Sequence, residues 1–208
     1  NWLTFLLAMW LRFLLTKALS SKYKEVFVMS KLYISDLHLG HKNAIVHDNR
    51  PFADLDEMHS SIIANWNNVV KKEDEVYILG DFAWKKSVAN KILPQLKGHK
   101  FLVRGNHDKI NDEMRSYFVW IKNYSVITDG ETELVLSHYP IAHWYNQYRG
   151  AVHLYGHVHN SKDYKAYLQY SDICSKMGIP FESYNVGCML PYMGYSPRTL
   201  EDIRRNIK

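Results

Sequence analysis

Short apolar runs of strand length recur along the chain from residue 31 onward. The run from Val76 to Leu79 is nearly continuous in apolar character, which is typical of a strand buried on both faces of a parallel sheet. We predict six strands, at Lys31–Ser35, Val76–Gly80, Lys100–Gly105, Glu133–His138, Val152–Gly156 and Glu182–Gly187.

Apolar residues at helical spacing fill the segment between the first two predicted strands. Asp54, with Glu57 three positions later, predicts an N-cap and capping box for a helix that extends to Lys72. Three further helices are predicted, at Ser87–Leu96, Asp112–Ile121 and Thr199–Ile207. Pro94 bends or shortens the first of these three. Helices and strands alternate early and strands dominate later, which favours a single α/β layered domain.

Residues 1–28 differ in character from the rest of the chain. The stretch from Trp2 to Leu15 is nearly all apolar, but it is shorter than the roughly 20 residues that a bilayer requires, and it contains Arg12. It also lacks the basic start and small-residue cleavage site of a signal peptide. We expect residues 1–28 to lie outside the functional domain, which then comprises residues 29–208, with a membrane-surface anchor as the alternative.

The composition is that of an ordinary globular protein, with 47% hydrophobic and 23% charged residues. Residues 1–30 carry +3 of the formal net charge of +5, and the remaining +2 is too little to demand a nucleic acid or acidic membrane as partner. The two cysteines, Cys174 and Cys188, predict free thiols in a reducing compartment such as the cytoplasm, with a single disulfide as the alternative. The sequence carries no signal for an oligomeric state.

Residues of the types that bind metal ions follow five of the predicted strands, where open α/β sheets build their sites. The clusters are Asp36-Leu37-His38, Gly80-Asp81, Gly105-Asn106-His107-Asp108, Ser137-His138 and Gly156-His157-Val158-His159. In extended backbone, residues two apart point the same way, so the Asp36/His38 and His157/His159 pairs can each grip one locus. The glycines allow tight exits from the strands and close approach of the backbone. One such fragment arises easily by chance, but five in order indicate one shared site.

In their order and context, the five clusters resemble the motifs of the calcineurin-like metallophosphoesterase superfamily, over essentially Lys31 to the C-terminus. The flanking Ser137-His138-Tyr139-Pro140 and Asn185-Val186-Gly187 are similar to its small, cap-less bacterial and phage members. The resemblance implies a four-layer α/β/β/α sandwich and a hydrolase that cleaves phosphate esters at two metal ions. It implies that the first ion is held by Asp36, His38, Asp81 and His159. It implies that the second is held by Asp81, Asn106, His138 and His157.

Mixed nitrogen and oxygen ligands favour Mn²⁺, Fe, Zn²⁺, Co²⁺ or Ni²⁺ over Ca²⁺ or Mg²⁺, and we expect Mn²⁺. The resemblance further implies direct attack on phosphorus by a hydroxide that bridges the ions, with His107 as the general acid that protonates the departing alcohol. Asp108 is expected to orient His107, with a turn residue that bonds its own backbone as the alternative.

Five further side chains near the motifs are candidates for contact with substrate: His41, Arg50, Arg104, Tyr139 and His143. We expect a small phosphoester as substrate, with a diester favoured over a monoester because no arginine clamp for a dianion is evident. A non-catalytic metal-binding scaffold on the same fold and a nuclease are the alternatives. The nearly neutral domain disfavours the nuclease, because nucleic-acid binding needs a basic track. No stable membrane span is expected.

Overall fold

The computed structural model describes residues 29–207. The prediction that residues 1–28 stand apart from the functional domain therefore concerns a segment outside the described residues. Their strands form two four-stranded sheets. The first sheet is parallel throughout and contains, in order, β1 (Lys31–Ile34), β2 (Glu75–Ile78), β3 (His99–Val103) and β4 (Phe118–Lys122). The second contains, in order, β5 (Tyr124–Asp129), β6 (Thr132–Ser137), β7 (Val152–Tyr155) and β8 (Ser183–Asn185). In the second sheet β5 runs antiparallel to β6, and the other neighbours are parallel.

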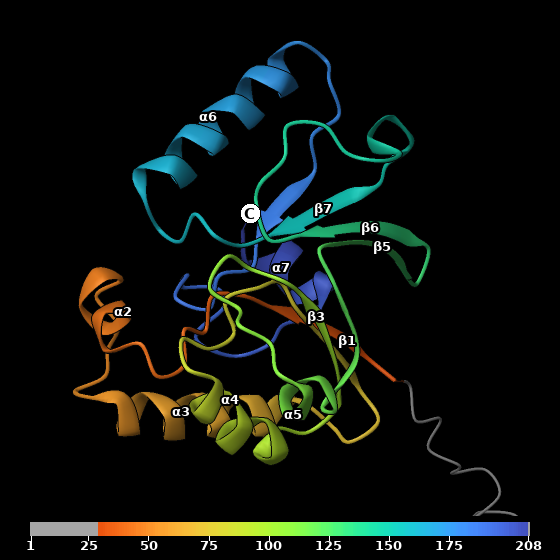
Figure 1. Ribbon diagram of the computed structural model, residues 1–208. Helices are drawn as coiled ribbons and strands as arrows, with labels where there is room; N and C mark the ends of the chain where they lie inside the picture. Colours follow the sequence, from red (N-terminus) through yellow and green to blue (C-terminus); the bar gives the residue numbers. More distant parts are fainter. Residues whose placement is uncertain (1–28, 208) are drawn as a thin grey trace, which may run out of the picture.

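Helices cover the outer faces of the two sheets (Figure 1). The first sheet is covered by α3 (Leu55–Val69), α4 (Lys86–Ile92) and the single-turn α5 (Asp112–Arg115), and the second by α6 (Lys162–Lys176). The remaining helical elements are α2 (Lys42–His47), α7 (Leu200–Asn206) and short 3-10 turns at Leu93–Gln95 and Gln147–Arg149. The arrangement confirms the predicted α/β/β/α sandwich. Within residues 29–207, no helix combines the length and apolar character needed to cross a membrane.

The main core lies between the sheets and beneath α3. Ile34, Ile78 and Leu102 of the first sheet share one buried cluster with Leu136 and Leu154 of the second. A smaller cluster of Val135, Trp144 and Ala151 lies on the other face of the second sheet. The two cysteines are free and buried.

The strongest helix prediction is confirmed in detail. The Asp54 carboxylate accepts the Glu57 backbone N–H at 2.9 Å, and Met58, Ile62 and Trp66 are the buried positions of α3. All six predicted strands are present, and their ends differ from the predicted ones by at most two residues. The helix predicted around Ser87–Leu96 ends as an α-helix at Ile92 and continues as a 3-10 turn that contains Pro94.

The predicted helix Asp112–Ile121 is wrong beyond its first turn, because the chain instead forms β4 at the edge of the first sheet. The Trp120 ring lies 5.3 Å from the Phe101 ring and 6.0 Å from the Tyr77 ring, centroid to centroid. This packing across neighbouring strands outweighs the local helical pattern.

The sequence pattern also missed α2, β5 and α6. Helix α6 buries only Cys174 fully, so it lacks the apolar stripe that reveals a helix in sequence. The serine before it, Ser161, accepts the backbone N–H groups of Asp163 and Tyr164 and provides the N-cap.

The two sheets meet where their edge strands β1 and β8 end, at the carboxyl ends of the strands. The Ser35 N–H donates to the Val186 carbonyl at 2.9 Å, and the Cys188 N–H donates to the Ser35 carbonyl at 2.9 Å. Every loop that follows a parallel strand of either sheet therefore opens toward the same edge of the molecule.

Candidate metal centre

Two groups of side chains at this shared edge could each hold a metal ion. The first group contains Asp36, His38 and His159, and the second contains Asp81, His138 and His157. In each group, one candidate ligand atom of every residue lies within 4.8 Å of the others. Asp36 and His38 share the first group, as their spacing predicts. His157 and His159 belong to different groups, which agrees with the family resemblance and not with the spacing argument.

The Asp81 carboxylate lies between the two groups. Its Oδ2 atom is 3.6 Å from His38 Nε2 and 3.5 Å from His138 Nε2. Its other oxygen, Oδ1, accepts the backbone N–H of His107 at 2.9 Å. One carboxylate oxygen thus faces both groups, which suits the bridging role that the family resemblance implies.

Hydrogen bonds fix the orientation of the second group. His138 donates from Nδ1 to the Leu79 carbonyl at 2.8 Å, which leaves the lone pair of Nε2 directed into the centre. His157 Nδ1 lies 3.2 Å from this Nε2 atom, and the Asn106 side-chain oxygen lies 3.0 Å from it. Asn106 therefore joins the second group, as the resemblance implies.

The spacing and chemistry of the donors fit divalent ions. Two ligands bound at about 2.1 Å to one ion lie roughly 3–4 Å apart, and His38 Nε2 and His159 Nε2 are 3.1 Å apart. Burial lowers the pKa of His38 to about 3, so its imidazole is neutral, which is the form that binds a metal. Burial also raises the pKa of the Asp81 carboxyl, a shift that a neighbouring cation would oppose.

The first group is held by a dense set of hydrogen bonds to Asp36. This fully buried carboxylate accepts from the Ser35 hydroxyl at 2.6 Å and from the His157 backbone N–H at 3.0 Å. Burial favours the neutral acid, but the His159 imidazole, with Nε2 3.6 Å from Asp36 Oδ1, holds the pKa of Asp36 below its usual range. Burial disfavours the charged form of His159, yet the nearby carboxylates of Asp36, at 3.6 Å, and Asp48, at 2.7 Å, raise the pKa of His159 to about 10. The two acids therefore supply negative charge that an ion in the first group would neutralise.

The backbone of the candidate ligands is strained. Positive φ angles, between 45° and 68°, occur at Asp36, His38, Asp81, His157 and His159. A non-glycine residue in this left-handed region costs about 1–2 kcal/mol. Such strain is concentrated at sites where it aims side chains, and here it turns five side chains toward one place.

Close backbone packing explains the glycines of the motifs. A Cβ atom on Gly105 would lie 2.2 Å from Asp81 Oδ1, and one on Gly80 would lie 2.3 Å from His138 Nδ1. A Cβ on Gly156 would lie 2.5 Å from Asp36 Oδ2. The predicted close approach of the backbone at these three positions is confirmed.

Residues 29–171 match the model of the calcineurin-like phosphoesterase superfamily domain. The chain belongs to this superfamily. The uncharacterized protein MJ1445 of Methanocaldococcus jannaschii is 38% identical over 135 residues, which cover 63% of this chain and 70% of that protein. The Gene 66 protein of Mycobacterium phage L5 is 28% identical over 161 residues, which cover 62% of this chain and 76% of the phage protein.

A crystal structure of similar fold is that of AQ665, a protein of unknown function from Aquifex aeolicus. It has a TM-score of 0.64 and 27% sequence identity, and the match covers 86% of this chain and 99% of that chain. The candidate centre therefore lies in a member of a superfamily of phosphoesterases.

The predicted acid His107 lines the small pocket at the centre. The pocket has a volume of about 160 Å³, and His38, Asp81 and His159 also line it. The His107 ring lies 4.7 Å from the Trp84 ring, centroid to centroid. The backbone bond from His107 to Asp81 anchors the residue beside the carboxylate that faces both groups.

Asp108 contacts the backbone around the centre. Its carboxylate is buried and accepts the N–H groups of Asp81, Phe82 and Gly105 at 2.8–2.9 Å. Burial raises the pKa of Asp108, although these hydrogen bonds act to lower it. Only the contact with Gly105 matches the alternative of a turn residue. The other two contacts hold the backbone of Asp81 and Phe82, and none of the three involves the His107 imidazole.

Arg50 is placed differently from the expectation of substrate contact. Its side chain is fully buried, and its guanidinium donates to the Asp48 carboxylate and to the carbonyl oxygens of Asp36 and Leu37. Because these protein acceptors occupy the donors of the Arg50 guanidinium, it points into the protein and away from the open pocket.

The other candidate substrate contacts lie at the surface. The His41 ring stacks on Trp84 at 4.0 Å and lines the small pocket at the centre. Tyr139 and Arg104 line a hollow of about 480 Å³ beside His138. His143 is exposed and lines neither of these two pockets.

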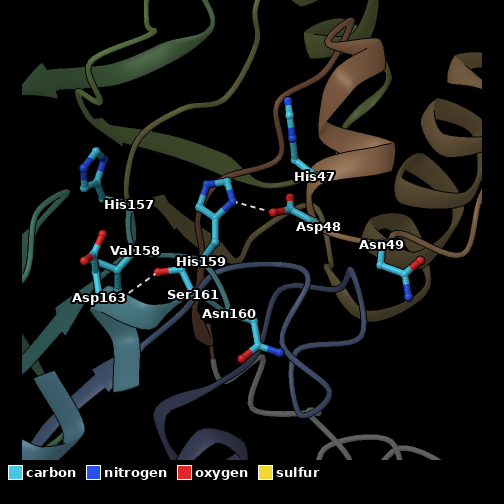
Figure 2. Close-up of a pocket in the computed structure, with 9 residues that line it drawn as sticks. All are labelled: His47, Asp48, Asn49, His157, Val158, His159, Asn160, Ser161 and Asp163. Atoms are coloured by element: carbon cyan, nitrogen blue, oxygen red, sulfur yellow. Dashed lines mark hydrogen bonds and ion pairs between the residues drawn. The ribbon is translucent and has the colours of Figure 1, made fainter. Parts of the chain in front are cut away.

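A larger hollow of about 550 Å³ lies on the side of His159 and contains a residue that the sequence motifs missed. Figure 2 shows the His159 imidazole turned toward the Asp48 carboxylate, and His159 Nδ1 lies 2.7 Å from Asp48 Oδ1. Asp48 and His159 are 111 positions apart, so no local spacing in the sequence reveals this contact. Asp48 joins the site because the loop after α2 folds back over the carboxyl end of β1.

Proposed function

We propose that this phosphoesterase hydrolyses small phosphate esters, with diesters preferred, at a centre of two divalent metal ions. Asp36, His38, Asp81 and His159 would hold the first ion. Asp81, Asn106, His138 and His157 would hold the second. The observation that carries the proposal is the convergence of these side chains from both sheets, with Asp81 Oδ2 within 3.6 Å of an imidazole nitrogen of each group.

When bound, two such ions supply an activated water and a polarised phosphate, as in other two-metal sites. The chain itself supplies a proton donor. The His107 imidazole lines the pocket and would give its proton to the departing alkoxide, a contribution of typically 10²–10⁴-fold. Its backbone bond to Asp81 and its contact with Trp84 support this role, because together they limit where the ring lies.

The two hollows that flank the centre support the preference for diesters. A phosphodiester carries two organic substituents, and the hollow beside His159 and the hollow beside His138 offer one place for each. A monoester dianion would gain most from an additional cation, yet Arg50 is turned into the protein and Arg104 lies on the rim.

The test is hydrolysis of bis-p-nitrophenyl phosphate by purified protein that is first stripped with chelator and then loaded with Mn²⁺. We expect turnover with Mn²⁺, loss of turnover on chelation, and slower turnover of the monoester p-nitrophenyl phosphate. Parallel loading with Zn²⁺, Co²⁺, Ni²⁺ and Fe²⁺ tests the choice of Mn²⁺. A protein that binds two ions but turns over neither ester would be a scaffold, and the proposal would fail.

The role of His107 is tested with His107→Ala. We expect the variant to bind two ions and to lose 10²–10⁴-fold in turnover of alkyl phosphodiesters, which have poor leaving groups. The loss should be smaller for p-nitrophenyl esters, whose leaving group needs less protonation. The control is His99→Ala, which removes an exposed imidazole at the start of β3. Equal losses on both leaving groups would contradict the role of general acid.

A further inference from the structure

Two residues with buried side chains, Asp48 and Arg50, connect the members of the first ligand group through hydrogen bonds. Neither belongs to the five clusters that the sequence shows. Asp48 accepts from His159 through one carboxylate oxygen, and its other oxygen accepts from Arg50 Nε at 2.9 Å and from Nη2 at 2.6 Å. The side chains of Asp48 and Arg50 are 6% and 0% exposed, so this ion pair is screened from water. A short, buried, two-point contact of this kind holds both partners in one geometry.

The remaining donors of Arg50 reach the strained loop that carries the other two ligands of the first group. Nη2 donates to the Asp36 carbonyl at 2.9 Å and Nη1 donates to the Leu37 carbonyl at 2.8 Å. Asp36 and His38 both have positive φ, so this loop needs stabilising contacts to keep its conformation. Arg50 therefore links the loop of Asp36 and His38 to the Asp48 carboxylate, and through it to His159.

The second ligand group is oriented by different means. The corresponding imidazole, His138, donates to the carbonyl of Leu79, which is a neutral acceptor. In contrast, His159 donates from Nδ1 to a carboxylate. With an ion in place of the proton on Nε2, the imidazole would keep its proton on Nδ1, and Nε2 would be a more basic metal ligand. Asp48 and Arg50 form none of their side-chain hydrogen bonds with the second group.

We propose that Asp48 and Arg50 are positioning residues for the first metal ion alone. They hold His159 in the tautomer and orientation that direct Nε2 at the ion. They also keep the Asp36–His38 loop in the conformation that presents its two ligands to the same ion. The inference rests on the proposed two-metal function, but it concerns the affinity of one of the two sites and not the substrate or the reaction.

The experiment measures binding of Mn²⁺ alone, by titration calorimetry and by the electron paramagnetic resonance signal of free Mn²⁺, at one fixed pH. Wild-type protein is expected to bind two ions. Asp48→Ala is expected to weaken one of the two sites by 10–100-fold and to leave the affinity of the other unchanged. Asp48→Asn, which retains an oxygen acceptor for the His159 N–H, should recover part of the loss. Arg50→Lys, which keeps the charge but not the planar fork, should weaken the same site.

The matched control is Asp74→Asn. Asp74 is another buried carboxylate, but its oxygens accept from the backbone N–H groups of Ser30 and Lys71. It lies at the amino end of β2, whereas the candidate ligands follow the carboxyl ends of the strands. We expect this variant to lower the unfolding midpoint in urea without changing either Mn²⁺ affinity. Asp48→Asn also serves if Asp48→Ala fails to fold, because its volume matches that of the native residue.

The outcomes separate this inference from the proposed function. If both sites of Asp48→Asn and of Arg50→Lys bind Mn²⁺ with the affinities of the wild type, the positioning role is overturned and the phosphoesterase proposal stays intact. Equal weakening of both sites would also overturn it, because a general loss of structure does not distinguish the groups. If the wild type binds two ions but hydrolyses no ester, the proposed function is overturned. If the Asp48 variants in that case still lose affinity at one site alone, the positioning role is supported.

Discussion

The buried histidine His153 makes a quantitative prediction for the pH dependence of stability. Its side chain is fully buried in β7, away from the candidate ligands, with Nδ1 donating to the Val135 carbonyl at 3.1 Å and Nε2 accepting the Ile141 N–H at 3.4 Å. Only the neutral imidazole satisfies both contacts, because a second proton would face the Ile141 N–H. Burial, opposed by the bond to Val135, lowers the pKa of His153 from 6.5 to about 4.

The sign follows from proton binding. Below pH 6.5 the unfolded chain binds a proton on this histidine that the folded chain rejects down to pH 4, so the free energy of unfolding falls as the pH falls. The stabilisation is complete above pH 6.5 and is lost progressively between pH 6.5 and pH 4. The full shift corresponds to about 3 kcal/mol, and about 2 kcal/mol of this is already lost at pH 5.

The assay is urea denaturation at pH 7.5 and pH 5.0, with chelator present at both, of wild type and His153→Gln. Glutamine can donate to Val135 and accept from Ile141 but does not titrate, so the other groups cancel in the comparison. The wild type should lose about 2 kcal/mol more than the variant between the two pH values. The exposed His99→Gln is the control and should retain the pH dependence of the wild type. A wild-type loss no larger than that of His153→Gln would refute the reasoning.

Three further predictions concern the site and the fold. Mn²⁺ at 100 times its dissociation constant should stabilise the chelator-treated protein by about 3 kcal/mol per site, measured as a rise in the melting temperature. An unchanged melting temperature on addition of Mn²⁺ would mean that the imidazoles hold no ion. Gly105→Ala should reduce Mn²⁺ binding, because its Cβ would lie 2.2 Å from Asp81 Oδ1; unchanged calorimetric titration would contradict this. Asp54→Ala should cost about 1 kcal/mol in urea denaturation through loss of the α3 N-cap, whereas Asp56→Ala, at an exposed position in the same turn, should cost less.

The parts of the fold that sequence periodicity predicts are those whose burial is set locally. Helix α3 was predictable because Met58, Ile62 and Trp66 lie on one face and Asp54 caps its start. Strand β4 was not, because its conformation depends on the Trp120 ring packing against Phe101 of the neighbouring strand, a contact between elements. Helix α6 was not predicted for a different reason: its inner face consists of half-buried tyrosines and not of an apolar stripe.

The site shows the same division between local and long-range information. Its candidate ligands were visible in sequence because each lies directly after a strand, and parallel strands deliver their carboxyl ends to one edge. Their conformation was not visible: a two-residue spacing suggested that His157 and His159 serve one locus, yet positive φ at both residues turns them into different groups. Asp48 and Arg50 carry no spacing signal either, because their partners are fixed only when the loop after α2 folds back. A motif therefore specifies which atoms can bind an ion, whereas the left-handed backbone and the buried ion pair beneath it decide where those atoms point.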